Sequence, residues 1–332
     1  MTDGIFFWVA ILVAALVGLV KSSEFMNRSA ERIGLSLGAS PFVVGVVLLA
    51  FGTSMPELLT SMIAMAEGQS EIIMGNVVGS NITNIFLILG VVGLVNASTI
   101  VFNLRHIQTD LNFLVGSAFL FGFIIMDGTF TRGEGVISIA GFVAYIWYIA
   151  TNDRSLVEIE LESLSEDEIA AQERAEARSQ HVVRAKWSDY TLFVLSGGVL
   201  FFSAEYAVRS VVEMSEQIGI ATEVIATSAV ALGTSLPELV VSVDAVRKDQ
   251  PEMALGNILG SCVFNIFLVA GASSLFGELA VTDYIRIEAF LFMLAATLFC
   301  FWITREKRLG RFDGFIFLLF YLVFIGRLLG FL

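Results

Sequence analysis

Long hydrophobic runs alternate with short polar segments along nearly the whole chain. The runs Ile5–Val20, Pro41–Met65 and Ile72–Val95 carry few or no charged residues, and a helix needs roughly 20 apolar residues to cross a bilayer. The pattern predicts an all-α integral membrane protein with ten transmembrane helices. The expected spans are residues 5–22, 41–66, 71–95, 108–126, 134–151, 188–208, 221–246, 252–276, 284–303 and 312–331.

The composition agrees with this pattern. Of the 332 residues, 56% are hydrophobic and only 15% are charged, with a mean hydropathy of +0.82, whereas soluble domains carry about 25% charged residues. The net charge of −13 owes much to nine acids in the polar stretch 152–187, and it gives no reason to expect a nucleic-acid partner. We expect membrane lipids and small ions as partners, no cofactor and no obligate protein partner.

The basic residues fall unevenly on the two sides of the ten expected spans. If the N-terminus lies outside, the inner loops hold fifteen of the 19 Lys and Arg residues and the outer loops hold four. Cytoplasmic loops are enriched in Lys and Arg. We therefore expect a multi-pass protein of the plasma (cell inner) membrane, with both termini outside and the stretch 152–187 in the cytoplasm.

The chain also contains an internal repeat with an ungapped register of 181 residues. Ala50–Gly90 aligns with Ala231–Gly271, and 20 of these 41 positions are identical. Five expected spans precede the acidic linker 152–187 and five follow it, so the second half enters the membrane from the opposite side. The sequence thus predicts an N-terminal half 1–151 and a C-terminal half 188–332 related as inverted five-helix repeats, an arrangement common among secondary transporters.

The repeated segment GTSMPE combines a helix break with a buried acid. Pro56 cannot donate a backbone hydrogen bond and crowds the carbonyl of Gly52, so we expect the helix to break there and to free nearby carbonyls, including that of Ala50. An ionised Glu57 at membrane depth is costly and marks a pathway or an ion site. The helix-breaking set is Pro56, Pro237, Gly52 and Gly233, and the polar set is Thr53, Ser54, Glu57, Thr234, Ser235 and Glu238.

The second repeated segment, GNVVGSNITN, supplies amides and hydroxyls. Ser80 and Asn84 lie one helical turn apart, and their counterparts are Ser261 and Asn265. Together the two halves offer two carboxylates, two amides, several hydroxyls and freed carbonyls. Such an all-oxygen set suits a hard cation such as Ca²⁺ or Na⁺. By themselves the residues leave open whether Na⁺ or a proton is the counter-ion.

At these residues the chain resembles the cation/calcium exchanger superfamily (Ca²⁺:cation antiporters), specifically its prokaryotic sodium/calcium exchangers. The paired motifs GTSMPELLTS with GNVVGSNITNI, and GTSLPELVVS with GNILGSCVFNI, look like the two α-repeats of that family, at about 41–95 and 221–276. The resemblance implies exchange of Na⁺ for Ca²⁺ by alternating access, with Glu57 and Glu238 as shared ligands of both ions. The implied ion-site residues are Ala50, Thr53, Ser54, Glu57, Ser80 and Asn84 with Ala231, Thr234, Ser235, Glu238, Ser261 and Asn265.

The chain departs from the family pattern at two places. Some members carry Asp where this chain has Asn84 or Asn265, and in the potassium-dependent branch an acid in the second repeat is linked to K⁺ cotransport. The two amides therefore favour K⁺ independence. Cys262 stands where the first repeat has Asn81, and this asymmetry indicates packing rather than ligation.

Three alternatives to a sodium/calcium antiporter are considered, and none of them is an enzyme. A Ca²⁺/H⁺ antiporter could use the same paired glutamates, but protons need no hydroxyl-rich GTS segment. A cation channel would not need a counter-ion, and a membrane scaffold has no reason to duplicate buried glutamates.

Acids outside the repeated site are expected to serve structural roles. Asp244 lies close to Arg247 and Lys248 and is interpreted as an interfacial acid. Glu24 and Glu205 each precede an Arg by four residues, which predicts ion pairs along one helix face.

Overall fold

The computed structural model describes residues 2–66, 68, 70–95, 100–101, 104–162, 185–218, 234–306, 308–328 and 330–332. Within them the chain is mostly helical. In this described part of the chain, five helices are long and apolar enough to cross a membrane, at Phe6–Leu37, Val44–Ala66, Ser70–Val95, Pro251–Ser274 and Tyr284–Arg305, and a shorter apolar helix covers Leu111–Asp127. Helices also cover the spans expected at 134–151, 188–208 and 312–331, whereas the span expected at 221–246 lies partly outside the described residues.

The N-terminal half consists of helices joined by short connections. Two π-helical segments interrupt its central helices, and π-helical turns are rare and frequent at functional sites. In chain order the elements are α1 (Thr2–Leu37), α2 (Pro41–Val43), a π-helix (Val44–Leu49), α3 (Ala50–Thr53), α4 (Met55–Ala66), α5 (Ser70–Ile82), a π-helix (Thr83–Leu89), α6 (Gly90–Val95), β1 (Ile100–Val101), α7 (Leu104–Ile124), a 3₁₀ turn (Ile125–Asp127), β2 (Thr129–Phe130) and α8 (Arg132–Glu162).

The C-terminal half repeats this order where it is described. Its π-helical segment at Asn265 matches the one at Thr83 to within two positions of the 181-residue register, so the interruption belongs to the repeat. The elements are α10 (Trp187–Ile218), α12 (Leu236–Arg247), α13 (Pro251–Phe264), a π-helix (Asn265–Val269), α14 (Ala270–Ser274), β3 (Leu279–Ala280), a π-helix (Tyr284–Ala289), α15 (Phe290–Arg305), β4 (Arg308–Leu309) and α16 (Arg311–Leu328).

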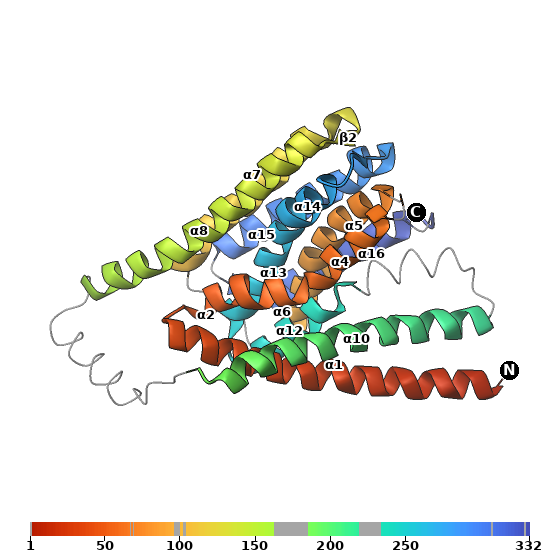
Figure 1. Ribbon diagram of the computed structural model, residues 1–332, viewed down its shortest axis with the longest axis horizontal. Helices are drawn as coiled ribbons and strands as arrows, with labels where there is room; N and C mark the ends of the chain where they lie inside the picture. Colours follow the sequence, from red (N-terminus) through yellow and green to blue (C-terminus); the bar gives the residue numbers. More distant parts are fainter. Residues whose placement is uncertain are drawn as a thin grey trace.

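Helices α1 and α10 form a layer of their own. They pack along each other in antiparallel directions beneath the remaining helices in Figure 1. Only 22% of the residues in the most apolar stretch of α1 are buried, compared with 94% in the corresponding stretch of the helix Pro251–Ser274. Apolar side chains in the first half of α1, such as Phe7 and Val17, therefore point outward, as expected for a helix that borders lipid.

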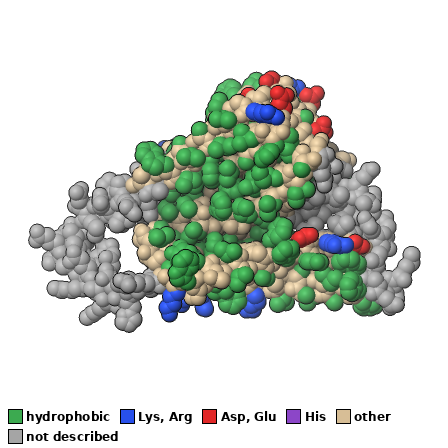
Figure 2. Space-filling view, in the orientation of Figure 1, with side chains coloured by type: hydrophobic (Ala, Val, Ile, Leu, Met, Phe, Trp, Pro, Cys, Tyr) green, Lys and Arg blue, Asp and Glu red, His purple; other side chains and the backbone are tan. Residues whose placement is uncertain are grey.

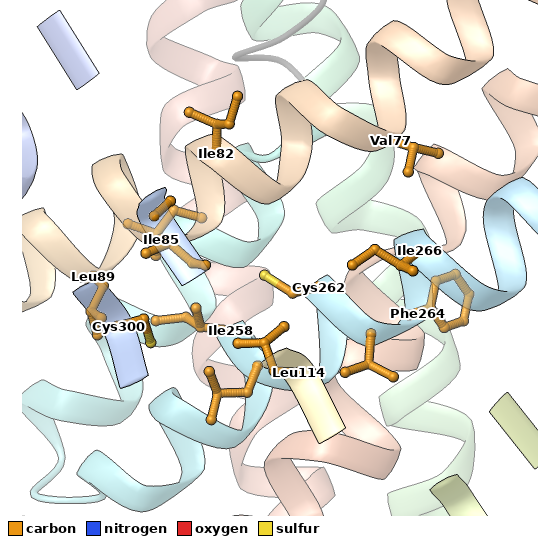
Figure 3. Packing of buried hydrophobic residues seen from close by; sticks show 14 of the residues in the cluster. Val77, Ile82, Ile85, Leu89, Leu114, Ile258, Cys262, Phe264, Ile266 and Cys300 are labelled. Atoms are coloured by element: carbon orange, nitrogen blue, oxygen red, sulfur yellow. The ribbon is translucent and has the colours of Figure 1, made fainter. Parts of the chain in front are cut away.

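The centre of the molecule is built from α5 and α13, the helices that carry the second repeated segment. Every residue of α13 from Met253 to Phe264 is buried. Cys262 and Cys300 lie in this core among Ile85, Ile258 and Leu114 (Figure 3). Cys262 packs against these hydrocarbon side chains, and its thiol also neighbours the amide of Asn84.

Two short antiparallel ladders join the halves. β1 pairs with β4 through Ile100 and Leu309, and β2 pairs with β3 through Phe130 and Leu279. Each ladder takes one strand from each half. The sequence patterns did not predict these strands, because two-residue strands carry no periodicity that hydropathy can register.

The outer surface is largely hydrophobic. Figure 2 shows hydrophobic side chains across most of the visible face, with acidic and basic side chains at its upper edge and right side and basic side chains along its lower border. Many large apolar side chains are exposed, including Phe7, Phe123 and Trp302. A surface of this kind agrees with a belt in contact with lipid.

The ion pairs at the helix surfaces differ in part from expectation. Glu24 pairs with Lys21 at 3.0 Å, and Arg209 pairs with Glu213 at 3.9 Å, so the predicted pairs with Arg28 and Glu205 are wrong. An acid has neighbours three and four positions away in both directions along a helix, and sequence spacing alone does not choose among them.

Asp244 holds α12 to α1. Its carboxylate accepts hydrogen bonds from Lys248 Nζ at 2.7 Å and from Asn27 Nδ2 at 2.6 Å. The predicted proximity to Lys248 is confirmed. The contact with α1 adds a polar link between the outer helix layer and the central helices.

Candidate cation-binding site

Among the described residues, a helix break occurs at a serine in each repeat. Ser54 separates α3 from α4 with φ −91° and ψ 3°, and Ser235 precedes α12 with φ −90° and ψ 0°. Pro56 and Pro237 then lie in the first turn of the following helix, where a missing N–H is tolerated. A break beside the proline therefore occurs in both repeats, with the same backbone form.

The break differs from expectation in its details. Gly52 lies inside α3, where it packs against Met26, so it does not itself break the helix. The carbonyl of Ala50 is not freed, because it accepts the backbone N–H of Ser54 at 2.9 Å. The same carbonyl is also within 3.5 Å of the Thr53 hydroxyl, a second donor. Ala231 and Gly233 lie outside the described residues.

Hydroxyl groups reach two buried carboxylates across the interface between the halves. Glu57 is 1% exposed and Glu238 is 0% exposed, and they lie close enough for their charges to interact. The hydroxyl of Ser54 donates to Glu238 Oε1 at 2.9 Å. The hydroxyl of Thr234 is in turn a hydrogen-bond partner of Glu57. Each half therefore places a hydroxyl on the carboxylate of the other.

A serine cluster surrounds the second-half carboxylate. Ser54 Oγ lies 2.9 Å from Ser261 Oγ, and Ser261 Oγ lies 3.5 Å from Glu238 Oε1. The equivalent serines of the other pair are arranged differently. Ser80 donates to Asn76 Oδ1 at 3.3 Å, and Ser235 Oγ is buried without a hydrogen-bond partner in the described part of the chain. The two sides of the site are therefore unequal.

Several buried polar atoms of these residues have no hydrogen-bond partner among the described residues. They include Glu57 Oε2, Glu238 Oε2 and both side-chain polar atoms of Asn84 and Asn265. Buried polar groups are nearly always hydrogen-bonded, and an unpaired group calls for an explanation such as a bound ion. These unpaired oxygens belong to the set that the sequence nominated, although others, such as Ser29 Oγ and Ser273 Oγ, lie outside it.

The donor set is oxygen-rich and carries few charges. No group of three or more His, Cys, Asp or Glu side chains occurs in the part of the chain that the structure describes. A cation at this place would therefore depend on two carboxylates and on neutral hydroxyl, amide and carbonyl oxygens. Hard cations such as Ca²⁺ and Na⁺ accept such ligands.

Two asparagines of the polar centre were missed from the sequence. Asn257 is buried, lies 3.1 Å from the Thr53 hydroxyl and donates to Ser242 Oγ at 3.0 Å. Asn76 occupies the equivalent position and contacts Ser61. Both asparagines stand at positions that are identical in the two repeats. Each also lies one helical turn before a predicted site serine, Ser80 or Ser261, and these two features together could have identified them from the sequence.

A cavity of about 470 Å³ opens beside α5. Its walls are mostly apolar, and its polar lining includes Asn76 and Ser80 from the central helix. Glu71 and Tyr284 also line it, near the helix ends.

Comparison with known proteins places this site in a family. The sequence profile described as "Sodium/calcium exchanger protein" matches residues 7–151 and 188–330. The chain belongs to this exchanger family. Both repeated segments, with Glu57 and Glu238, lie inside the matched regions.

Relatives within the exchanger family match over nearly the full length. The chain is 31% identical over 339 aligned positions to the sodium/calcium exchanger MaX1 of Methanosarcina acetivorans, covering 95% of this chain and 96% of that one. It is 28% identical over 281 positions to the inner membrane protein YrbG of Escherichia coli, covering 83% of each. Among solved structures, the sodium-calcium exchanger NCX_Mj superposes with a TM-score of 0.80 at 26% identity, covering 97% of this chain and 99% of that chain.

Proposed function

We propose that this protein is a secondary active antiporter, not an enzyme, which exchanges Na⁺ for Ca²⁺ across the membrane by alternating access. One observation carries the proposal. Two buried carboxylates, Glu57 and Glu238, each receive a hydroxyl from the opposite half and each retain an oxygen without a hydrogen-bond partner among the described residues. Two of these relatives, MaX1 and NCX_Mj, are named sodium/calcium exchangers, and their names support the same pair of ions.

The coupling follows from shared ligands. Two carboxylates can neutralise one Ca²⁺ or be shared by Na⁺ ions, but not both at once, so loading one ion displaces the other. A site that opens to either side only when loaded then exchanges the two ions. The proposed ligands are the carboxylates of Glu57 and Glu238, the hydroxyls of Thr53, Thr234, Ser54, Ser235, Ser80 and Ser261, the amides of Asn84 and Asn265, and the carbonyls of Ala50 and Ala231.

The proposed topology has ten membrane helices in two inverted halves, 1–151 and 188–332, joined by a cytoplasmic linker 152–187. The two β ladders support this arrangement, because β1 and β2 of one half pair with β4 and β3 of the other. Both termini would lie outside a cell membrane. In this orientation Glu71 and Tyr284 lie near the outer surface, and the cavity beside α5 is the proposed outer approach to the site.

Calcium uptake into proteoliposomes tests the proposal. Vesicles loaded with Na⁺ should take up Ca²⁺ when the outward Na⁺ gradient is imposed, and not when a H⁺ or K⁺ gradient replaces it. Uptake that follows only a pH gradient would identify a Ca²⁺/H⁺ antiporter instead. Uptake that proceeds without any counter-gradient would identify a channel.

Substitution of the carboxylates tests the site itself. Glu57→Gln and Glu238→Gln should each abolish exchange, because each removes one of the two charges that balance Ca²⁺ in a low-dielectric interior. The matched control is Glu24→Gln, whose carboxylate forms an exposed pair with Lys21 and should leave exchange unchanged. Full activity in a folded Glu57→Gln or Glu238→Gln variant would remove that residue from the site.

A further inference from the structure

Asn257 connects three segments of the site without being one of its proposed ligands. Its Nδ2 donates to Ser242 Oγ at 3.0 Å and lies 3.5 Å from the Glu238 carbonyl, both in α12. Its Oδ1 lies 3.1 Å from the hydroxyl of Thr53, which belongs to the other half. Because Asn257 is 0% exposed, both ends of its amide are committed to protein partners.

These bonds lie in a seam where the two halves approach at backbone distance. A Cβ on Gly256 would meet the carbonyl of Phe42, and a Cβ on Gly260 would lie 2.8 Å from Ala50 Cβ. Asn257 itself is 0% exposed, so its amide is shielded from bulk solvent. In such surroundings a hydrogen bond is strong, and an unpaired polar group is costly.

The amide acts on the ion site through its neighbours. Thr53 immediately precedes Ser54, whose hydroxyl holds Glu238 Oε1, and Ser242 lies one turn beyond Glu238 in α12. Asn257 therefore fixes the end of α3 relative to the start of α12. Apart from Asn257, the hydroxyl of Thr53 contacts the carbonyls of its own helix at Leu49 and Ala50, 3.0 and 3.5 Å away, and the carboxylate of Glu238.

We propose that Asn257 is a positioning residue that sets the balance between Na⁺ and Ca²⁺; this rests on the antiport function proposed above. Ca²⁺ is bound mainly through charge, which the two carboxylates supply. Na⁺ carries half that charge, so its binding depends more on correctly placed neutral oxygens. Loss of the amide disturbs the neutral oxygens at the end of α3 and leaves both carboxylates in place.

The test compares Asn257→Ala with a matched control, Asn81→Ala. Asn81 is also buried, but among the described residues its amide donates at 2.7 Å to Val77 of its own helix and to no residue of the other half. Asn257→Ala should raise the half-saturating Na⁺ concentration about two- to ten-fold, the equivalent of one hydrogen bond. The half-saturating Ca²⁺ concentration should change less than about two-fold. Asn81→Ala should leave the ratio of the two unchanged.

Two further measurements separate positioning from general loss of structure. In a cycle with Thr53→Val, the double variant Thr53→Val/Asn257→Ala should bind Na⁺ no more weakly than Thr53→Val alone, because Asn257 acts through Thr53. Additive losses would overturn the proposal, as would an equal shift for Na⁺ and Ca²⁺. If Asn257→Ala does not fold, Ser242→Ala releases the other end of the same amide and should likewise raise the half-saturating Na⁺ concentration. An unchanged ratio of the half-saturating Na⁺ and Ca²⁺ concentrations in Ser242→Ala would also overturn the proposal.

Ion-dependent thermal shifts in detergent measure the same ratio without transport. If wild-type vesicles show no Na⁺-driven uptake, the antiport proposal fails. The ratio of Na⁺ to Ca²⁺ concentrations that give half-maximal stabilisation still decides the role of Asn257, so the two failures are distinguishable.

Discussion

Gly79 and Gly260 are identical in the repeat but should respond oppositely to substitution by Ala. A Cβ added at Gly260 would lie 2.8 Å from Ala50 Cβ and 2.9 Å from both the Cα and the carbonyl oxygen of Val46. A Cβ added at Gly79 would meet nothing within 4 Å. Both residues lie inside helices, α13 and α5, so helix propensity acts equally on the two.

The expected magnitudes follow from these contacts. Overpacking of a tight interface costs about 1–3 kcal/mol, and replacing Gly by Ala within a helix returns roughly 0.5–1 kcal/mol. Gly260→Ala should therefore lower the free energy of unfolding by about 1–2 kcal/mol, since the atoms it meets are backbone and Cβ atoms that cannot rotate away. Gly79→Ala should raise it by roughly 0.5–1 kcal/mol.

Thermal unfolding in detergent, with Ca²⁺ chelated, measures the difference, which should amount to a few degrees in Tm. Calcium uptake provides a second readout. Gly260→Ala pushes against Ala50 and should reduce uptake, whereas Gly79→Ala should not. A Gly260→Ala variant as stable and as active as Gly79→Ala would refute the close approach of α13 to α3.

Three further outcomes are expected. Ser54→Ala removes the 2.9 Å hydrogen bond to the buried carboxylate of Glu238 and should cost about 1.5–3 kcal/mol of stability. The hydroxyl removed by Ser235→Ala has no partner among the described residues, so this variant should lose less. Equal shifts in Tm for the two variants would contradict the asymmetry. Asp244→Asn removes a partly buried ion pair of 2.7 Å and should lower the free energy of unfolding by about 1 kcal/mol. Glu24→Gln removes an exposed pair and should lower it by about 0–0.5 kcal/mol. Denaturation at two salt concentrations measures both losses. Ca²⁺ at 100 times its Kd should stabilise the protein by about 2.7 kcal/mol, chelation should remove the effect, and a Glu57→Gln variant that still shows it would exclude that carboxylate as a ligand.

Much of the site could be read from the chain because its signals are local. Pro56 lacks an N–H wherever it stands, so a break close to it was predictable, although it falls at Ser54 rather than at Gly52. A carboxylate such as Glu57 in a hydrophobic run is costly in any membrane fold, and its duplication in the second half made an ion site the natural interpretation.

Contacts between the halves could not be read in the same way. The ladder between Phe130 and Leu279, and the reach of Ser54 to Glu238, join residues far apart in the chain with no pattern that pairs them. The ion pairs of Glu24 and Arg209 were predicted with the wrong partners, because helical spacing offers several neighbours at similar distance.

The sequence by itself determined the hydrophobic character of the chain, its duplication in a 181-residue register, the interrupted helices and the buried glutamates. Only the tertiary structure decided that equivalent residues are not equal. Asn257 is locked between the halves while Asn76 lines a cavity, and Gly260 is pressed against Ala50 while Gly79 is not. The physical reason is that a repeat encodes the same local geometry twice, whereas one conformation gives its two copies different surroundings.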